Sequence, residues 1–135
     1  MSLGRILVVD DEAEVRKSVR LILTKAGYEV VEAEDGGKAM EVMNSGDNAR
    51  MIDTIISDIY MPNMNGMEAI AYFRSQFPSI PVIVLTGQTD RQWVDMLYKQ
   101  GVSDYLVKPV EPETLTSLVR KTTRERMLLK DSFKT

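Results

Sequence analysis

The sequence predicts an α/β domain in which a parallel five-stranded sheet is covered by helices on both faces. Five short apolar segments rich in β-branched residues alternate with five segments of helical period. The apolar segments are continuous, as in strands that are buried on both faces. The length of 135 residues fits one compact core. Because parallel strands need right-handed crossovers, the expected sheet is doubly wound with strand order 2-1-3-4-5.

The first half of the chain is predicted to contribute three strands, at residues 5–10, 28–33 and 53–58. Between the first two, apolar residues recur with helical spacing from Val15 to Ala26, and Gly27 follows at the position of a left-handed C-cap. A second helix is predicted at 36–43, and "NSGDNAR" (44–50) is predicted to be a polar loop.

The second half is predicted to contain two strands and three helices. The strands are expected at 80–87 and 102–109, and the helices at 67–76, at 89–100 and from Pro112 onward. In the middle helix, Trp93, Met96 and Leu97 are expected to face the core. Proline suits the first turn of a helix, so Pro112 marks the start of the last one.

The composition excludes several kinds of site. The chain has no Cys and no His, which rules out disulfides, thiolate nucleophiles, Ser-His-Asp triads and histidine metal sites. Any chemistry must use carboxylates, Lys, Tyr or hydroxyl groups, with a hard cation bound through oxygen. A net charge of −3 gives no general attraction to nucleic acid or to an anionic membrane. Without a signal-peptide pattern or a membrane-length apolar run, a cytoplasmic protein is expected.

Polar residues stand at the ends of four predicted strands. Asp10 and Asp11 end the first strand, Asp58 ends the third, Thr86 the fourth and Lys108 the fifth. In an open parallel sheet, ligands bind beyond the carboxyl ends of the strands, and order 2-1-3-4-5 makes the first and third strands neighbours. We therefore expect three carboxylates to share one crevice, with the long lysine side chain reaching it from the far strand.

Three carboxylates in one crevice raise one another's pKa values unless a cation compensates their charge. Mg²⁺ suits such a cluster because it binds a few carboxylates together with phosphate oxygens. Beside the metal, an ionised Asp58 is predicted to attack phosphorus and form an aspartyl phosphate. The ammonium of Lys108 and the hydroxyl of Thr86 are predicted to hold the phosphoryl oxygens. The crevice is thus interpreted as a phosphoryl-acceptor site.

Each of these residues also has a simpler interpretation. Asp10 and Asp11 precede a helix and could cap its N-terminus. Asp58 could form an Asx turn, Thr86 could simply end a strand, and a lysine before proline is uninformative alone. Their joint occurrence at one edge of the sheet favours the functional interpretation.

Four motifs resemble the receiver domain of two-component response regulators. They are "VVDDE" (8–12), "SDIYMPNMNG" (57–66), "VIVLTG" (82–87) and "DYLVKP" (104–109), and in this order they are specific as a set. The predicted strand order is likewise that of flavodoxin-like sheets. The resemblance implies that a sensor histidine kinase or a phosphotransfer protein donates a phosphoryl group to Asp58. It also implies that Asp10 or Asp11, Asp58 and the backbone carbonyl of Tyr60 hold Mg²⁺.

The resemblance further implies a conformational switch. On phosphorylation, Thr86 would move toward the phosphoryl group and Tyr105 would turn inward, which changes the face made by the fourth strand, the helix after it and the fifth strand. Without the motif, Tyr105 would be interpreted as a half-buried strand tyrosine. Gly87 would let its backbone approach the phosphoryl group, and the peptide bond between Lys108 and Pro109 would be cis.

Two positions depart from the common pattern of the family. Tyr60 lies two residues after the acceptor and is bulkier than many residues at that position, and Gln88 lies two residues after Thr86. In the family, both positions border the path of the hydrolytic water. We therefore expect Tyr60 and Gln88 to set the lifetime of the phosphorylated state.

The resemblance covers residues 5–125, which are predicted to form the receiver domain. Residues 126–135 are predicted to be a C-terminal helix extension or a linker to an output domain. The tail is rich in Arg and Lys, which fits a solvated helix face. It also carries apolar residues that need a partner if the helix continues, either a following domain or a second copy in a homodimer: Met127, Leu128, Leu129 and Phe133.

Other function classes fit this sequence less well. A phosphatase or phosphotransferase of the haloacid-dehalogenase type would carry an Asp-x-Asp signature and a cap domain, whereas this chain has "DDE" and no room for a cap. A flavin or nucleotide binder would need a Gly-rich phosphate loop after the first strand, which is absent. A receiver-shaped scaffold that is never phosphorylated remains an alternative. The expected function is therefore a signalling switch, enzymatic only toward its own phosphorylation and dephosphorylation.

Overall fold

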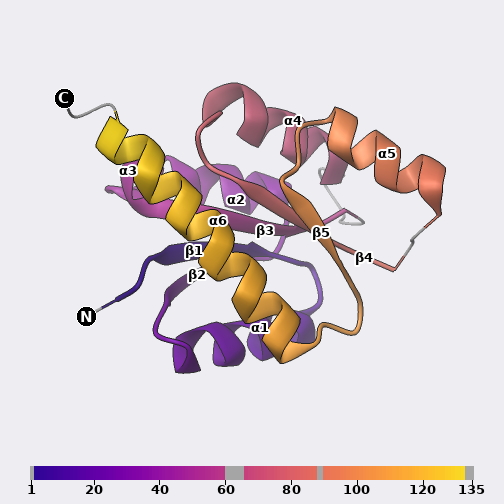
Figure 1. Cartoon of the computed structure of the whole chain (residues 1–135), viewed down its shortest axis with the longest axis horizontal. Coiled ribbons are helices and arrows are strands. Elements are labelled where there is room, and N and C mark those ends of the chain that lie inside the picture. The colour runs from indigo at the N-terminus through magenta and orange to yellow at the C-terminus, as the bar shows by residue number, and fades with distance from the viewer. Residues whose placement is uncertain (1, 60–65, 88–89, 133–135) are drawn as a thin grey trace.

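The computed structural model describes residues 2–59, 66–87 and 90–132 (Figure 1). Five parallel strands form one sheet in the order β2-β1-β3-β4-β5, as the sequence predicts. The strands are β1 (Arg5–Val9), β2 (Glu29–Ala33), β3 (Ile52–Asp58), β4 (Val82–Thr86) and β5 (Asp104–Val107). The helices are α1 (Ala13–Lys25), α2 (Gly36–Met43), α3 (Asn48–Met51), α4 (Gly66–Gln76), α5 (Arg91–Lys99) and α6 (Pro112–Ser132).

Two hydrophobic clusters lie on opposite faces of the sheet. Helices α1 and α6 cover one face, where Leu23 and Val119 pack against buried residues of the strands. Helices α2, α4 and α5 cover the other face, where Phe73 is the largest fully buried side chain. Every residue of the central strands β3 and β4 is buried, because both of their faces carry helices. The two-layer covering explains the continuous apolar segments of the sequence.

The described residues form six helices, whereas the sequence predicts five. The loop predicted at 44–50 contains the start of α3, a single four-residue turn of helix with no buried residue. Such a short, polar turn has no apolar period and therefore gives no signal in the sequence. The orientation predicted for Met96 is also wrong, because this side chain is 37% exposed while Leu97 is fully buried. Gly27 has φ of +103°, the left-handed C-cap conformation that the sequence predicts.

Helix α6 runs without a break through residue 126, where the domain boundary was predicted, and its last turns contact the body of the protein. At the amino end of β3, the hydroxyl of Thr54 hydrogen-bonds with those of Thr122 (2.9 Å) and Thr123 (3.2 Å). The buried Asp53 carboxylate pairs with Nζ of Lys130 at 3.0 Å. Arg126 also joins α6 to the body of the protein, because its Nη1 donates to the hydroxyl of Ser79.

The apolar residues of the predicted extension lie on the outer side of α6. Met127, Leu128 and Leu129 are 40%, 60% and 45% exposed, while Phe133 lies outside the described residues. These exposed apolar side chains could contact an output domain or a second copy of the chain, and both partners stay predictions. None of the described helices is both long and apolar enough to cross a membrane.

Candidate functional site

The register of the sheet brings the predicted site residues together. Val9 pairs with Ser57 across β1 and β3, so the next residues on the two strands, Asp10 and Asp58, emerge side by side. On the other side of the sheet centre, Thr86 pairs with Val107, and Lys108 follows directly. The site therefore forms where four strands end at the same edge of the sheet.

Lys108 contacts both central carboxylates. Its Nζ donates to Oδ2 of Asp58 at 3.0 Å and lies 3.2 Å from Oδ2 of Asp10 and 3.4 Å from Oε1 of Glu12. Burial alone would lower the pKa of Lys108, but the hydrogen bond to Asp58 and the negative charge of Asp10 outweigh burial and hold the pKa above its ordinary value. The lysine is thus a fixed positive charge at every physiological pH.

Asp10 is fully buried and does not cap α1. The residue at the N-cap of α1 is Glu12, which makes no side-chain capping hydrogen bond. Instead, Oδ1 of Asp10 accepts from the backbone N–H of Glu12 at 2.9 Å. Burial raises the pKa of Asp10, and the charge of Asp58 adds to the rise, while the Glu12 N–H and Lys108 oppose it. The simpler capping interpretation therefore does not account for this residue.

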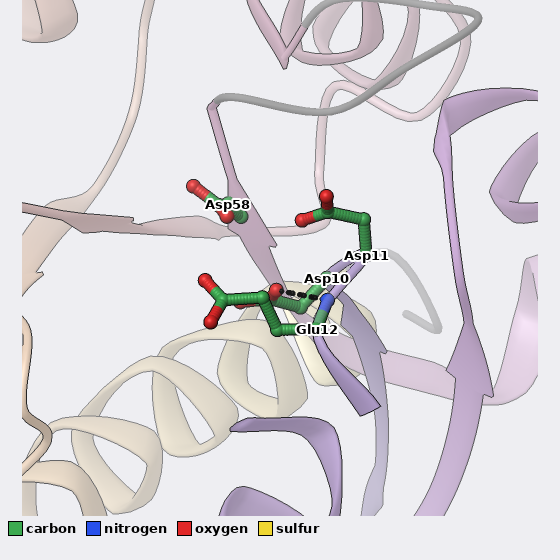
Figure 2. Close-up of side chains that lie close together, drawn as sticks. All are labelled: Asp10, Asp11, Glu12 and Asp58. Carbon is green, nitrogen blue, oxygen red and sulfur yellow. Dashed lines mark hydrogen bonds between the residues drawn. The ribbon is translucent and has the colours of Figure 1, made fainter. Parts of the chain in front are cut away.

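Four acidic residues form a cluster that fits a divalent cation. Figure 2 shows Asp58 facing Asp10, Asp11 and Glu12, and a carboxylate oxygen from each lies within 4.8 Å of the others. Oδ2 of Asp10 is buried and accepts no hydrogen bond from the described residues, although Nζ of Lys108 lies at ion-pair distance, 3.2 Å. An all-oxygen donor set with one buried, unsatisfied carboxylate oxygen suits Mg²⁺. We call these four residues the acidic cluster.

The sequence interpretation did not include Glu12 in this site. Its carboxylate is exposed, and its proximity to Lys108 depends on the turn between β1 and α1. The signal was present in the motif "VVDDE", where three acids follow one strand.

Thr86 ends β4 and is buried, with 1% of its surface exposed. Its hydroxyl oxygen accepts a hydrogen bond from Nε1 of Trp93 at 3.0 Å, which the sequence interpretation did not anticipate. Tyr105 is half-buried, packs against the same core as Trp93 and makes an edge-to-face contact with Tyr98 at 6.2 Å between ring centroids. Thr86 and Tyr105 lie on the adjacent strands β4 and β5, where Tyr105 pairs with Val84.

The remaining predicted residues are placed as follows. The peptide bond between Lys108 and Pro109 is cis, as the resemblance implies. A side chain at Gly87 would meet no atom of the described residues within 4 Å. Tyr60 and Gln88 lie outside the described residues, and their roles stay predictions.

Comparison with known proteins identifies relatives along most of the chain. The family model described as "Response regulator receiver domain" matches residues 6–120. Chemotaxis protein CheY1 of Helicobacter pylori is 36% identical over 114 residues, which cover 82% of this chain and 90% of that protein. The sensor kinase/phosphatase CqsS of Vibrio cholerae is 36% identical over 118 residues, which cover 85% of this chain and 17% of that protein. The transcriptional regulator NtrC of Proteus hauseri is 32% identical over 93% of this chain and 26% of its own length.

Solved structures agree with these sequence relatives. A receiver domain protein from Clostridium thermocellum has a TM-score of 0.86 with 30% identity and covers 94% of this chain and 99% of its own. Chemotaxis protein CheY4 of Vibrio cholerae has a TM-score of 0.80 with 35% identity and covers 90% of this chain and 99% of its own. The chain therefore belongs to the family of response regulator receiver domains of two-component signalling.

Proposed function

We propose that this receiver domain is a switch that accepts a phosphoryl group on Asp58. One observation carries the proposal: Lys108 donates to Asp58 at 3.0 Å at the edge where the acidic cluster gathers. An acceptor carboxylate needs neighbours that neutralise an incoming phosphoryl group, and this arrangement supplies a fixed cation and a set of metal ligands. No part of the site requires the His or Cys residues that the chain lacks.

In the proposed reaction, a carboxylate oxygen of Asp58 attacks phosphorus. A new O–P bond forms, the bond between phosphorus and the donor's leaving atom breaks, and its electron pair departs with the donor. Lys108 holds one phosphoryl oxygen through its ammonium, and the Thr86 hydroxyl donates to another. Asp10, Asp11, Asp58 and the Tyr60 carbonyl would hold Mg²⁺, with Glu12 nearby, and the bound metal would neutralise charge on the phosphoryl oxygens. The domain is proposed to catalyse only its own phosphorylation and the later hydrolysis of the aspartyl phosphate, in which water takes the phosphoryl group and inorganic phosphate leaves.

The output of the switch is proposed to be a change of the face formed by β4, α5 and β5. Thr86 moves toward the phosphoryl group, and Tyr105 turns toward the space that Thr86 leaves. The half-buried position of Tyr105 supports this proposal, because a ring at the edge of a core can occupy two positions. Gly87 has no side chain, and its backbone is proposed to approach the phosphoryl group.

The proposed donor is a sensor histidine kinase or a phosphotransfer protein in the cytoplasm. Receiver domains occur alone and within longer proteins, as the chemotaxis protein and the regulator NtrC illustrate by their coverage. An output domain or a second copy of this chain is therefore the proposed downstream partner. No nucleic-acid or membrane contact is proposed for this domain.

Intact mass after incubation with Mg²⁺ and acetyl phosphate tests the proposed function. The wild-type protein is expected to gain one phosphoryl group, because the small donor presents phosphorus without a kinase. The adduct is expected to be absent in Asp58→Asn, absent without metal, and present in the control Asp53→Asn, whose carboxylate lies at the opposite end of β3. No adduct in the wild type, after rapid quenching that preserves acyl phosphates, would leave a receiver-shaped scaffold.

The lifetime of the phosphorylated state is proposed to depend on Tyr60 and Gln88. Replacing each with a side chain of different size and polarity, as in Tyr60→Asn and Gln88→Ala, should change the access or orientation of the hydrolytic water. The phosphorylated variants are expected to decay at rates that differ by several-fold from that of the wild type. The loss of the mass adduct over time measures these rates. Unchanged decay in both variants would refute these roles.

A further inference from the structure

Trp93 is joined directly to the predicted switch residue Thr86. Its indole Nε1–H donates to the Thr86 hydroxyl oxygen at 3.0 Å, although the two residues belong to different elements, α5 and β4. The Trp93 ring is half-buried and packs against the core cluster beneath α2, α4 and α5. The indole thus ties a buried hydroxyl at the functional edge to the first turn of a surface helix.

The position of Trp93 is fixed by its backbone as well as by its ring. The backbone N–H of Trp93 donates to the carboxylate of Asp90, the N-cap of α5, at 3.0 Å. An N-cap of this kind stabilises the first turn of a helix. Because both the cap and the core packing hold Trp93, the indole cannot follow a displaced hydroxyl freely.

The chemistry of the two groups determines what this bond does. An indole N–H can only donate, whereas a threonine hydroxyl has one proton to donate and lone pairs to accept. The bond from Trp93 therefore restricts the rotamer of Thr86 and the direction of its hydroxyl proton. Any movement of Thr86 toward a group on Asp58 must stretch or break this bond.

We propose that Trp93 is a positioning residue that holds Thr86 in the unphosphorylated arrangement and transmits its release to α5. The inference rests on the proposed function, because it concerns the same site. When Thr86 moves toward the phosphoryl group, the indole loses its acceptor, and α5 loses the hydrogen bond that joins its first turn to β4. The bond thus opposes activation, and its removal favours the phosphorylated arrangement.

The first test compares the affinity of three proteins for beryllofluoride with Mg²⁺, measured by fluorine NMR of the bound analogue. Trp93→Phe keeps an aromatic ring against the core, removes the N–H donor and makes the ring smaller. We expect it to bind beryllofluoride about 3- to 10-fold more tightly than wild type, the effect of one neutral hydrogen bond that no longer has to break. Tyr72→Phe on α4 is the control, since its hydroxyl accepts from Asn44 and not from the site. It should match the wild type.

The second test uses the indole as its own reporter. Trp93 is the only tryptophan of the chain, so a single indole N–H resonance is expected in a proton–nitrogen spectrum. Beryllofluoride should shift this resonance in the wild type. Thr86→Val removes the acceptor while keeping a β-branched side chain, so it should shift the resonance in the same direction before any analogue is added.

The outcomes separate the two levels of the proposal. If the wild type neither binds beryllofluoride nor gains a phosphoryl group, the proposed function fails and this inference fails with it. If the wild type does both, but Trp93→Phe binds the analogue equally or more weakly, the positioning role is overturned while the acceptor function stands. An indole resonance that does not respond to beryllofluoride would overturn it in the same way.

Discussion

Replacement of Lys108 by methionine is expected to slow phosphorylation of Asp58 by about 100-fold, the lower end of the effect of removing one hydrogen-bond donor from an oxyanion site. Methionine fills a similar length but carries no charge, so phosphoryl oxygens lose their closest protein cation. The loss acts on the transition state, where negative charge spreads over the phosphoryl oxygens. The rate of adduct formation with acetyl phosphate and saturating Mg²⁺, followed by intact mass, measures the effect.

The matched control for this change is Lys121→Met on the exposed side of α6, which should phosphorylate at the wild-type rate. Lys108→Met also leaves Asp10 and Asp58 without the ammonium that lies between them, so its fold is checked by circular dichroism in the same buffer. A folded Lys108→Met protein that is phosphorylated at the wild-type rate would contradict the role assigned to the lysine.

Replacement of Asp10 by asparagine is expected to stabilise the metal-free protein and to remove most of its stabilisation by Mg²⁺. Burial, with the charge of Asp58, raises the pKa of Asp10 in the folded state. The folded protein therefore binds this proton more tightly than the unfolded chain does. The associated stability is fully present below the ordinary pKa of aspartate and is lost as the pH rises through the raised, folded-state pKa.

This sign gives a measurable pH dependence. With a chelator present to remove Mg²⁺, Asp10→Asn should become more stable relative to wild type as the pH rises from 4 to 8. At pH 8 its free energy of unfolding should exceed that of the wild type by about 1 kcal/mol, a usual size for a single substitution. Saturation with Mg²⁺ at 100 times its Kd should add about 2.7 kcal/mol to the wild type and much less to Asp10→Asn. Urea denaturation at each pH, with and without Mg²⁺, provides the measurement.

The exposed Asp95 on α5 supplies the control for Asp10. Asp95→Asn should leave both the pH profile and the response to Mg²⁺ as in wild type. If the difference between Asp10→Asn and wild type is constant over this pH range, Asp10 does not carry the raised pKa. If Mg²⁺ stabilises Asp10→Asn as strongly as wild type, the acidic cluster does not hold the metal through this residue.

The sequence was sufficient to predict the sheet order and the meeting of Asp10, Asp58 and Lys108. Continuous apolar strands and the handedness of crossovers restrict the topology, and the topology brings strand ends to one edge. The same reasoning could not identify α3, whose four residues bury nothing. It also could not predict the hydrogen bond from Trp93 to Thr86, because periodicity gives the buried side of a helix but not the group that an indole N–H meets. The wrong prediction for Met96 also comes from periodicity, because the buried side of the nine-residue α5 is too narrow to include this residue.

The contacts that hold α6 against the amino end of β3 have a consequence for anything joined to the chain. Three residues of α6 bind it to β3, the strand that carries Asp58: Thr122, Thr123 and Lys130. The rotation of α6 about its own axis is therefore fixed relative to Asp58. A domain attached through a continuous helix would have an orientation fixed by this rotation. Each residue inserted into the junction would turn it by about 100° and advance it by about 1.5 Å. Fusions to this domain should therefore depend on helical phase, with a period of about 3.6 residues, rather than on linker length alone.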